Sequence, residues 1–193
     1  MRGIFLITVL LASALSQTVP AEVVEVPLPE LRGRYYTEDT VTRYAAVQMN
    51  PAPLSIAGVS IRITGTHTLG EIMCEVGGPF MISQPYPVAF LASIPDTING
   101  DLWMADQSSQ LPSGDFEIIL PFREIYGWHV TWDFLLAGYA EVRLDGGGAG
   151  FTLNCSPTIW PDATVTEAVL LVDGEFPVAT EGSTWGSIKA LFR

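Results

Sequence analysis

The sequence predicts an all-β protein, an antiparallel β-sandwich of jelly-roll type with a short helix at its C-terminal end. Short runs of alternating apolar and polar residues recur along the chain, and turn-forming residues separate them at near-regular intervals. No long segment with helical periodicity occurs before the last dozen residues. Such a pattern is typical of sandwiches and jelly rolls, in which one face of each strand is buried against a second sheet.

The first 21 residues have the layout of a secretory signal peptide. Arg2 precedes an apolar run from Ile4 to Leu15, and small residues follow, so that cleavage after Ser16 or after Ala21 fits the pattern. The apolar run is about 12 residues long, whereas ~20 are needed to span a bilayer. We therefore expect a secreted protein, extracellular or periplasmic, whose mature chain has no transmembrane segment.

The remaining chain divides into three predicted parts. Residues 22–40 are expected to form an extended lead-in or edge strand, because the two prolines of EVVEVPLPEL exclude a central strand. The sandwich is expected over 41–178 and a tail with a short amphipathic helix over 179–193. The predicted strands are 42–48, 58–68, 71–76, 86–94, 101–105, 115–122, 128–136, 139–144, 151–155 and 164–172, with turns at 99–100, 113–114 and 173–174 and a hairpin loop at 145–150.

Composition limits the class of protein and its partners. About 172 residues remain after the predicted signal, which suits one domain. The chain is 48% hydrophobic and 16% charged, so it is not a disordered sequence. Its formal net charge is −12, and Lys189 is its only lysine. Nucleic acid is a poor partner for such a surface, because phosphate binding needs clustered Lys and Arg.

Cys74 and Cys155 are the only cysteines, and we expect them to form a disulfide because an exported chain folds in an oxidising compartment. The bridge would close a loop of roughly 80 residues and stabilise the fold by at most about 4.5 kcal/mol. The alternative is two buried free thiols. No zinc site is predicted, because the two cysteines and two histidines include no closely spaced ligand pair.

The stretch GWHVTWDF, residues 127–134, raises a choice between core and site. If it is a strand, one face carries Trp128, Val130, Trp132 and Phe134, and we expect this row to be core rather than a sugar-stacking platform. The other face carries His129, Thr131 and Asp133. Its residues lie about 7 Å apart, too far for a direct His–Asp hydrogen bond, so we expect a solvated face.

Other residues are better candidates for a ligand site. Trp103, Trp160 and Tyr126 lie near predicted turns, where exposed aromatic rings can pack against a glycan. The densest set of oxygen ligands is Asp96, Asn99, Asp101 and Asp106, which lacks the EF-hand pattern. Calcium is therefore the one candidate cofactor, and ordinary turn chemistry is the alternative interpretation of these residues.

No catalytic residue is assigned. The sequence has no G-x-S-x-G elbow, no P-loop and no G-x-G-x-x-G after a strand, and no pair among its 21 carboxylates stands out for glycoside hydrolysis. The hypothesis we favour is a secreted, non-catalytic module that binds a glycan, an envelope surface or another protein. The alternatives are a carbohydrate-active enzyme on a jelly roll and a structural or assembly component that docks through its C-terminal tail.

The tail has the pattern of a short helix. Ser183 is a suitable N-cap, and Trp185, Ile188 and Phe192 fall on one helical face. A helix of about ten residues is marginal alone and must pack on something. Because three exposed apolar side chains favour aggregation, we expect the tail to pack on its own sandwich, with a separate partner or sorting receptor as the alternative.

Deletion of residues 180–193 tests this expectation. If the tail packs on the sandwich, the truncated protein has a clearly lower melting temperature than the full chain. An equally stable truncated protein that no longer reaches its normal location contradicts self-docking and favours a separate partner.

Overall fold

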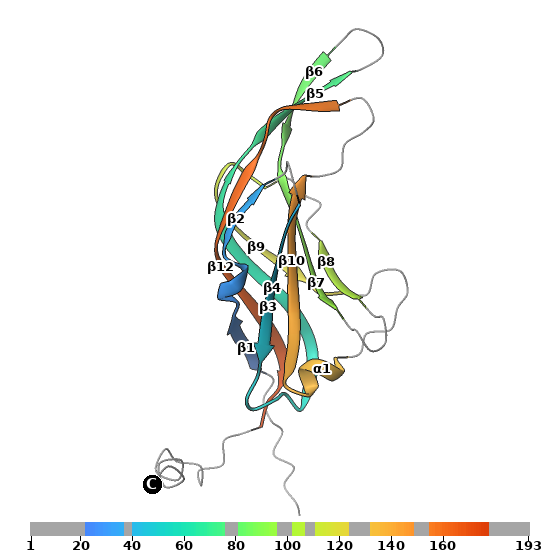
Figure 1. The fold of residues 1–193 in the computed structure, drawn as a ribbon. Coiled ribbons are helices and arrows are strands. Elements are labelled where there is room, and N and C mark those ends of the chain that lie inside the picture. The colour runs from blue at the N-terminus through green and yellow to red at the C-terminus, as the bar shows by residue number, and fades with distance from the viewer. Residues whose placement is uncertain are drawn as a thin grey trace, which may run out of the picture.

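The computed structural model describes residues 22–36, 40–75, 81–95, 102–106, 111–123, 132–148 and 155–177. This part of the chain is mostly antiparallel β-strand with almost no helix, which confirms the predicted all-β class (Figure 1). None of its helices is long and apolar enough to cross a membrane. The predicted signal peptide and the predicted C-terminal helix lie outside the described residues.

In the described residues no long helix separates one element from the next. In order they are β1 (Glu22–Pro27), the 3-10 turn η1 (Pro29–Leu31), β2 (Gly33–Tyr36), β3 (Val41–Gln48), β4 (Ser55–Thr68), β5 (Gly70–Glu75), β6 (Met81–Tyr86), β7 (Val88–Pro95), β8 (Leu102–Asp106), β9 (Gly114–Pro121), helix α1 (Asp133–Leu136), β10 (Tyr139–Gly148), β11 (Cys155–Ile159) and β12 (Asp162–Glu175).

The strands form three antiparallel sheets. The first has the order β1-β12-β4-β9, with β2 also paired to β12, and the second has the order β3-β10-β7-β8. Within these two sheets the pairs are nested in sequence: β7 pairs with β8, β4 with β9, β3 with β10, and β1 with β12. The third sheet, β11-β5-β6, extends from one end, where β5 follows β4 and β11 precedes β12 (Figure 1).

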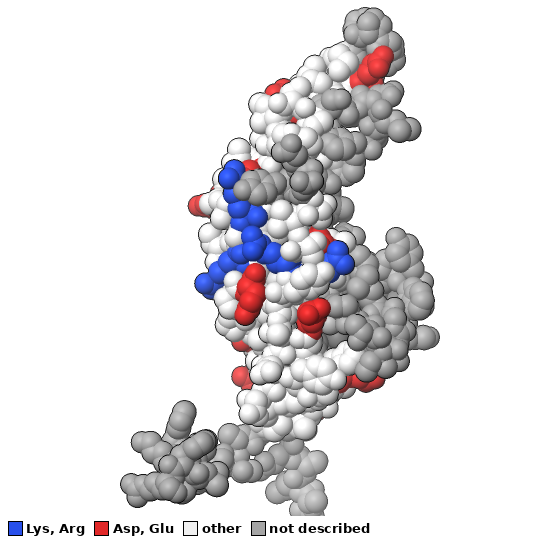
Figure 2. Space-filling view, in the orientation of Figure 1, with Lys and Arg blue, Asp and Glu red and all other residues white. Residues whose placement is uncertain are grey.

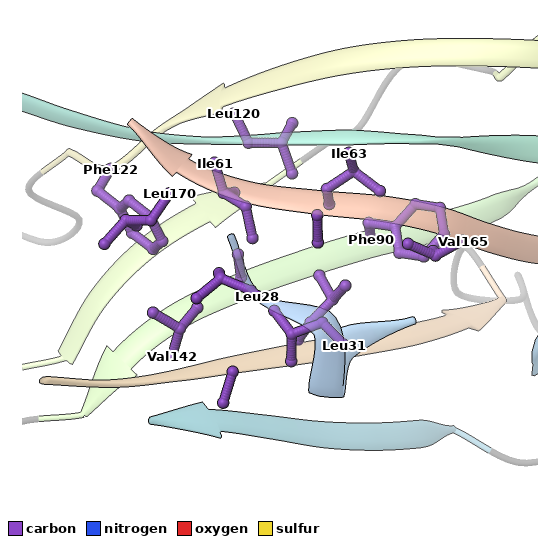
Figure 3. Packing of buried hydrophobic residues seen from close by; sticks show 14 of the residues in the cluster. Leu28, Leu31, Ile61, Ile63, Phe90, Leu120, Phe122, Val142, Val165 and Leu170 are labelled. Carbon is purple, nitrogen blue, oxygen red and sulfur yellow. The ribbon is translucent and has the colours of Figure 1, made fainter. Parts of the chain in front are cut away.

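One hydrophobic core joins the two large sheets. Ile61 and Ile63 of β4 and Leu170 of β12 are fully buried, and so are Phe90 of β7 and Val142 of β10. Figure 3 shows these side chains from the two sheets directed toward one another. The predicted alternation along β4, with apolar side chains inside and Ser60 and Arg62 outside, is confirmed.

The η1 turn and β2 fill the gap at one edge of this core. Leu28 and Leu31 are buried against both sheets (Figure 3). Tyr35 is also fully buried, and its hydroxyl donates a 2.7 Å hydrogen bond to the Leu31 carbonyl. Its ring meets the Phe90 ring edge-on at 5.4 Å. Burial raises the pKa of the Tyr35 hydroxyl, so the side chain stays neutral and keeps donating this bond.

The predicted strand over 128–136 is wrong where the structure describes it. Asp133–Leu136 form α1, a single helical turn in which Leu136 N–H donates to the Trp132 carbonyl. Only Leu135 of this turn is buried. Trp132 packs partly buried against the core, as the core interpretation expects, whereas Phe134 is not part of the core cluster and packs against the Tyr139 ring. A pattern of period two cannot exclude one helical turn over so few residues. Residues 124–131 lie outside the described part.

Two predicted turns are also wrong, because their glycines lie inside strands. The hairpin loop predicted over 145–150 is strand to Gly148 in β10, and Gly146 faces the core, where the Tyr35 ring occupies the space of a side chain. The turn predicted at 173–174 is a register shift within β12, where a Cβ on Gly174 would collide with the Ser55 carbonyl. Glycine marks close approach of neighbouring groups here, rather than a chain reversal.

Two glycines of β4 provide a matched test of this packing. A Cβ on Gly65 would collide with the Thr164 carbonyl beside the β12 bulge, whereas a Cβ on Gly58 would meet nothing within 4 Å. We expect Gly65→Ala to lower the free energy of unfolding by about 3 kcal/mol and Gly58→Ala to change it by less than about 0.5 kcal/mol. Denaturant unfolding of the two variants measures this difference, and equal stabilities would contradict the register of β4 against β12.

Candidate functional site

The aromatic residues predicted for a ligand site do not come from one sheet. Trp160 is 40% exposed and lies between β11 and β12, beside the three-stranded sheet. Trp103 belongs to β8 of the second large sheet, where its backbone pairs with that of Ile94. Tyr126 lies outside the described residues. The grouping of these three residues therefore stays a prediction without support from the strand arrangement.

The calcium prediction falls mostly outside the described chain. Asp96, Asn99 and Asp101 are not described, and Asp106 is the last residue of β8. Among the residues that are described, no group of three or more His, Cys, Asp or Glu side chains is arranged to hold a metal ion. The calcium site at residues 96–106 stays a prediction.

The two cysteines lie on neighbouring strands. Cys74 of β5 and Cys155 of β11 are directly opposite each other in an antiparallel pair, and the described residues include no free cysteine. Directly opposed residues in such a pair have Cα atoms about 4.5–5.5 Å apart. This spacing lies inside the range of about 4.4–6.8 Å that a disulfide requires, so the backbone register is compatible with the predicted bridge.

His67 is buried and has a structural role. It is 2% exposed, and its Nε2 atom accepts a 3.1 Å hydrogen bond from the Val88 backbone N–H. Its Nδ1 atom lies 3.1 Å from the Pro112 carbonyl, which can only accept a hydrogen bond. Nδ1 is therefore the donor to this carbonyl, and the ring joins β4, β7 and the segment before β9. Both nitrogens are occupied, which leaves no lone pair for a ligand.

The surface that best fits a binding site lies on the outer side of β3 and β10. Ala45 and Val47 of β3 point into the core, so their neighbours lie on the opposite side. We define the β3–β10 face by three directly opposed pairs of outward residues: Tyr44 with Arg143, Ala46 with Glu141, and Gln48 with Tyr139.

Two tyrosines lie at opposite corners of the β3–β10 face. Tyr44 is 52% exposed and Tyr139 is 51% exposed. Their positions differ by four residues along the strands, so their Cα atoms are about 14 Å apart. Ala46 lies between them and provides only a short side chain. The face thus has two aromatic rings with a small side chain between them. Glu141 and Arg143 lie beside this small side chain on the neighbouring strand.

Neighbouring side chains hold both ends of the face in place. The Phe134 ring of α1 packs 5.4 Å from the Tyr139 ring. At the other end the buried Asp145 carboxylate receives the Arg143 Nε–H at 2.9–3.1 Å and the Thr42 hydroxyl at 2.5 Å. The hydrogen bond to Asp145 raises the pKa of the Arg143 guanidinium, which therefore remains charged.

This arrangement suits recognition of a ligand that has both apolar faces and hydroxyl groups. Tyrosine rings pack against the C–H face of a sugar ring and offer a hydroxyl at their edge. A carboxylate and a guanidinium beside them can accept from and donate to sugar hydroxyls. These residues were not predicted from the sequence, because the aromatic candidates were chosen for their position near turns. The available signal was a tyrosine on the polar side of each alternating strand.

Comparison with known proteins does not assign a family. No family model matches the chain, and no curated protein matches it. Among solved structures it is similar to a candidate glycoside hydrolase from Bacteroides thetaiotaomicron, with a TM-score of 0.34 and 12% identity over 74% of this chain and 48% of that chain. A structure of infectious bursal disease virus, Gx strain, has a TM-score of 0.34 and 5% identity over 83% of this chain and 37% of that chain. This chain spans less than half the length of each, and at these TM-scores neither likeness bears on function.

His67→Ala tests the structural role of the buried imidazole. The substitution removes the acceptor for Val88 N–H and the donor to the Pro112 carbonyl, so we expect the free energy of unfolding to fall by about 2–4 kcal/mol. Thr68→Ala changes the exposed neighbour in the same strand and should cost less than about 0.5 kcal/mol. A His67→Ala protein as stable as the Thr68→Ala control would show that these two hydrogen bonds contribute little.

Proposed function

We propose that this protein is a secreted, non-catalytic jelly-roll module that binds a glycan on the β3–β10 face. The observation that carries the proposal is the pair of half-exposed tyrosines, Tyr44 and Tyr139, with Glu141 and Arg143 between them. Neither ring is buried in the core, and both lie on the outer surface of the same strand pair. A tyrosine side chain has only two rotatable bonds, so it loses little conformational entropy when it binds a flat ligand.

The strand order supports the jelly-roll part of the proposal. Nested pairing of β1 with β12, β3 with β10, β4 with β9 and β7 with β8 arises when a long antiparallel ribbon is rolled into two facing sheets. Jelly rolls and related sandwiches include lectin domains, which use a sheet face or loops to hold sugars. The fold permits glycan binding without establishing it, because one fold hosts many functions.

Binding measurements with alanine variants test the proposed face. Tyr44→Ala and Tyr139→Ala should each weaken binding of a recognised polysaccharide by at least tenfold, since a lost ring contact costs roughly 1–3 kcal/mol. Ile119→Ala is the matched control, because Ile119 is 54% exposed on the outer side of β9 in the other large sheet. Calorimetric titration across a panel of neutral and acidic polysaccharides gives the affinities, and thermal unfolding checks that the variants fold.

Three results would contradict the proposal in different ways. Wild-type affinity in both tyrosine variants removes the β3–β10 face as the site. Loss of binding in Trp160→Ala alone transfers the site to the link between β11 and β12. Release of reducing ends from any polysaccharide of the panel identifies an enzyme rather than a binding module.

We also propose that the mature protein is exported and contains the Cys74–Cys155 disulfide. The direct register of β5 and β11 supports it, and so does the signal-like start of the chain. Mass spectrometry of unreduced peptides should find the two cysteines linked. Replacement of both by serine should lower the free energy of unfolding by up to about 4.5 kcal/mol. Two free thiols in freshly exported protein would contradict the bridge.

A further inference from the structure

The margin between the two large sheets is filled only in part on the side where β1 and β3 are the edge strands. Leu28 and Leu31, around the η1 turn, are fully buried there and close the part of the margin next to β2. Along β1, before this turn, the structure has a groove of about 450 Å³ that β1 borders on one side and the residues after β3 on the other. We define the β1 groove by six of its lining residues: Val24, Val26, Met49, Pro51, Phe176 and Pro177.

The floor of the β1 groove is apolar and continues the hydrophobic core. Val24 and Val26 lie directly opposite Val172 and Leu170 of β12, which are fully buried, so both valines point to the core side of the first sheet. Both pack against the core cluster, and yet both remain partly exposed. An apolar occupant of the groove would remove this remaining surface from water, which is favourable.

Charged groups occur at the rim of the groove rather than on its floor. Among the described residues that line it, the charged ones are Glu22 and Glu25, both exposed, and the Glu25 carboxylate already pairs with Arg62 at 3.0 Å. Figure 2 shows charged side chains gathered at the level of β2 in Figure 1, whereas the end of the molecule where β1 lies is mostly uncharged on this face. An occupant with apolar side chains and a positive charge suits this groove.

The chain that follows β12 supplies such an occupant. Pro177 lines the groove, and residues 178–193 continue directly from it. The helix predicted in this tail has three large apolar side chains on one face. The tail also carries Lys189 and Arg193 with Glu181 as its only acidic residue, although the whole chain has a formal net charge of −12. Because the tail is attached at the groove, it binds there at a high effective concentration.

The dimensions of the tail match those of the groove. A helix over 183–192 is about 15 Å long, and the six residues of β1 span about 17 Å. Gly174 pairs with Glu22, so β12 ends beside the first residue of β1. The tail therefore needs only to turn back in order to run along β1. Residues 178–182 can span up to about 17 Å when extended, which is enough for this turn.

We propose that residues 178–193 occupy the β1 groove of their own sandwich, with the apolar face of the helix on Val24 and Val26. The docked tail completes the core at this margin and covers the free edge of β1, which protects that edge from pairing with another chain. This inference is independent of the proposed function, since neither Tyr44 nor Tyr139 lines the groove.

Trypsin cleavage after Lys189 in the full mature protein tests the docking. A docked tail resists cleavage, so this bond should be cut at least tenfold more slowly than in a synthetic peptide of residues 178–193. Val24→Asp places a charge on the floor of the groove and should raise the rate at least tenfold. Val23→Asp is the matched control, because Val23 is 54% exposed on the other side of β1, and it should leave the rate unchanged. Wild-type cleavage as fast as that of the peptide, or equal rates in the two variants, overturns the proposal.

A variant in the tail keeps the test decisive if Val24→Asp does not fold, as thermal unfolding would show. Trp185→Ala leaves every strand of the sandwich unchanged and should also raise the rate of cleavage after Lys189 at least tenfold. Ser187→Ala, on the opposite side of the predicted helix, is its control and should leave the rate unchanged. A rate that Trp185→Ala does not alter overturns the proposal.

Nuclear Overhauser effects in the full mature protein identify the docking site itself. We expect contacts between the Trp185 ring and the methyl groups of Val24. Contacts of this ring with Ile119 instead would place the tail on the outer side of the first sheet and overturn the groove. A sample mixed from labelled and unlabelled copies shows whether the contacts arise within one chain. Contacts that arise only between copies overturn self-docking and identify a second copy of this chain as the occupant.

Discussion

The antiparallel pair of β4 and β12 holds the other strands of the first large sheet and the start of the three-stranded sheet in position. Both strands are 14 residues long, and they pair from one end to the other. β12 carries β1 and β2 on its other edge, β4 carries β9, and their extensions form the three-stranded sheet with β6. Their inward faces supply Ile61, Ile63 and Leu170, each of which contributes roughly 1.5–3 kcal/mol by burial. A change in this register would displace every sheet at once.

The second large sheet is organised by its contact with this pair, and its outer side is where binding is proposed. Val142 and Phe90 anchor its strands on the common core, which leaves Tyr44 and Tyr139 on the opposite side. On the core-facing side of β3, the Arg43 side chain packs against Gly33 and Tyr35 of β2. The outward position of the two tyrosines therefore follows from the way β3 and β10 pack on the first sheet.

Sequence reasoning succeeded where a local pattern determines the structure. Alternation in β4 and β9 predicted strands whose inner residues are buried, because one face of each strand must meet another sheet. It failed at the glycines of β10 and β12. At these positions a ring or carbonyl that is distant in sequence leaves no space for a side chain. The helical turn α1 was missed because four residues show too little periodicity.

The site was less predictable than the fold, for a physical reason. Whether Tyr44 and Tyr139 share a surface depends on the register between β3 and β10, which are separated in sequence by residues 49–138. The ion pairs show the same limit, since Arg34 with Asp162 and Arg62 with Glu25 join residues far apart in sequence. A single sequence shows which residue types are present, but the pairing of strands decides which of them meet.

Amide hydrogen exchange of the native protein tests the central role of the β4–β12 pair most directly. The amides that exchange only by global unfolding should be concentrated in the middle of these two strands, around Ile61–Ile63 and Ala168–Leu170, while β1 and β3 at the sheet edges exchange through local opening. Greater protection in β3 and β10 than in β4 and β12 would contradict this central role, since the second sheet would then be the more stable unit.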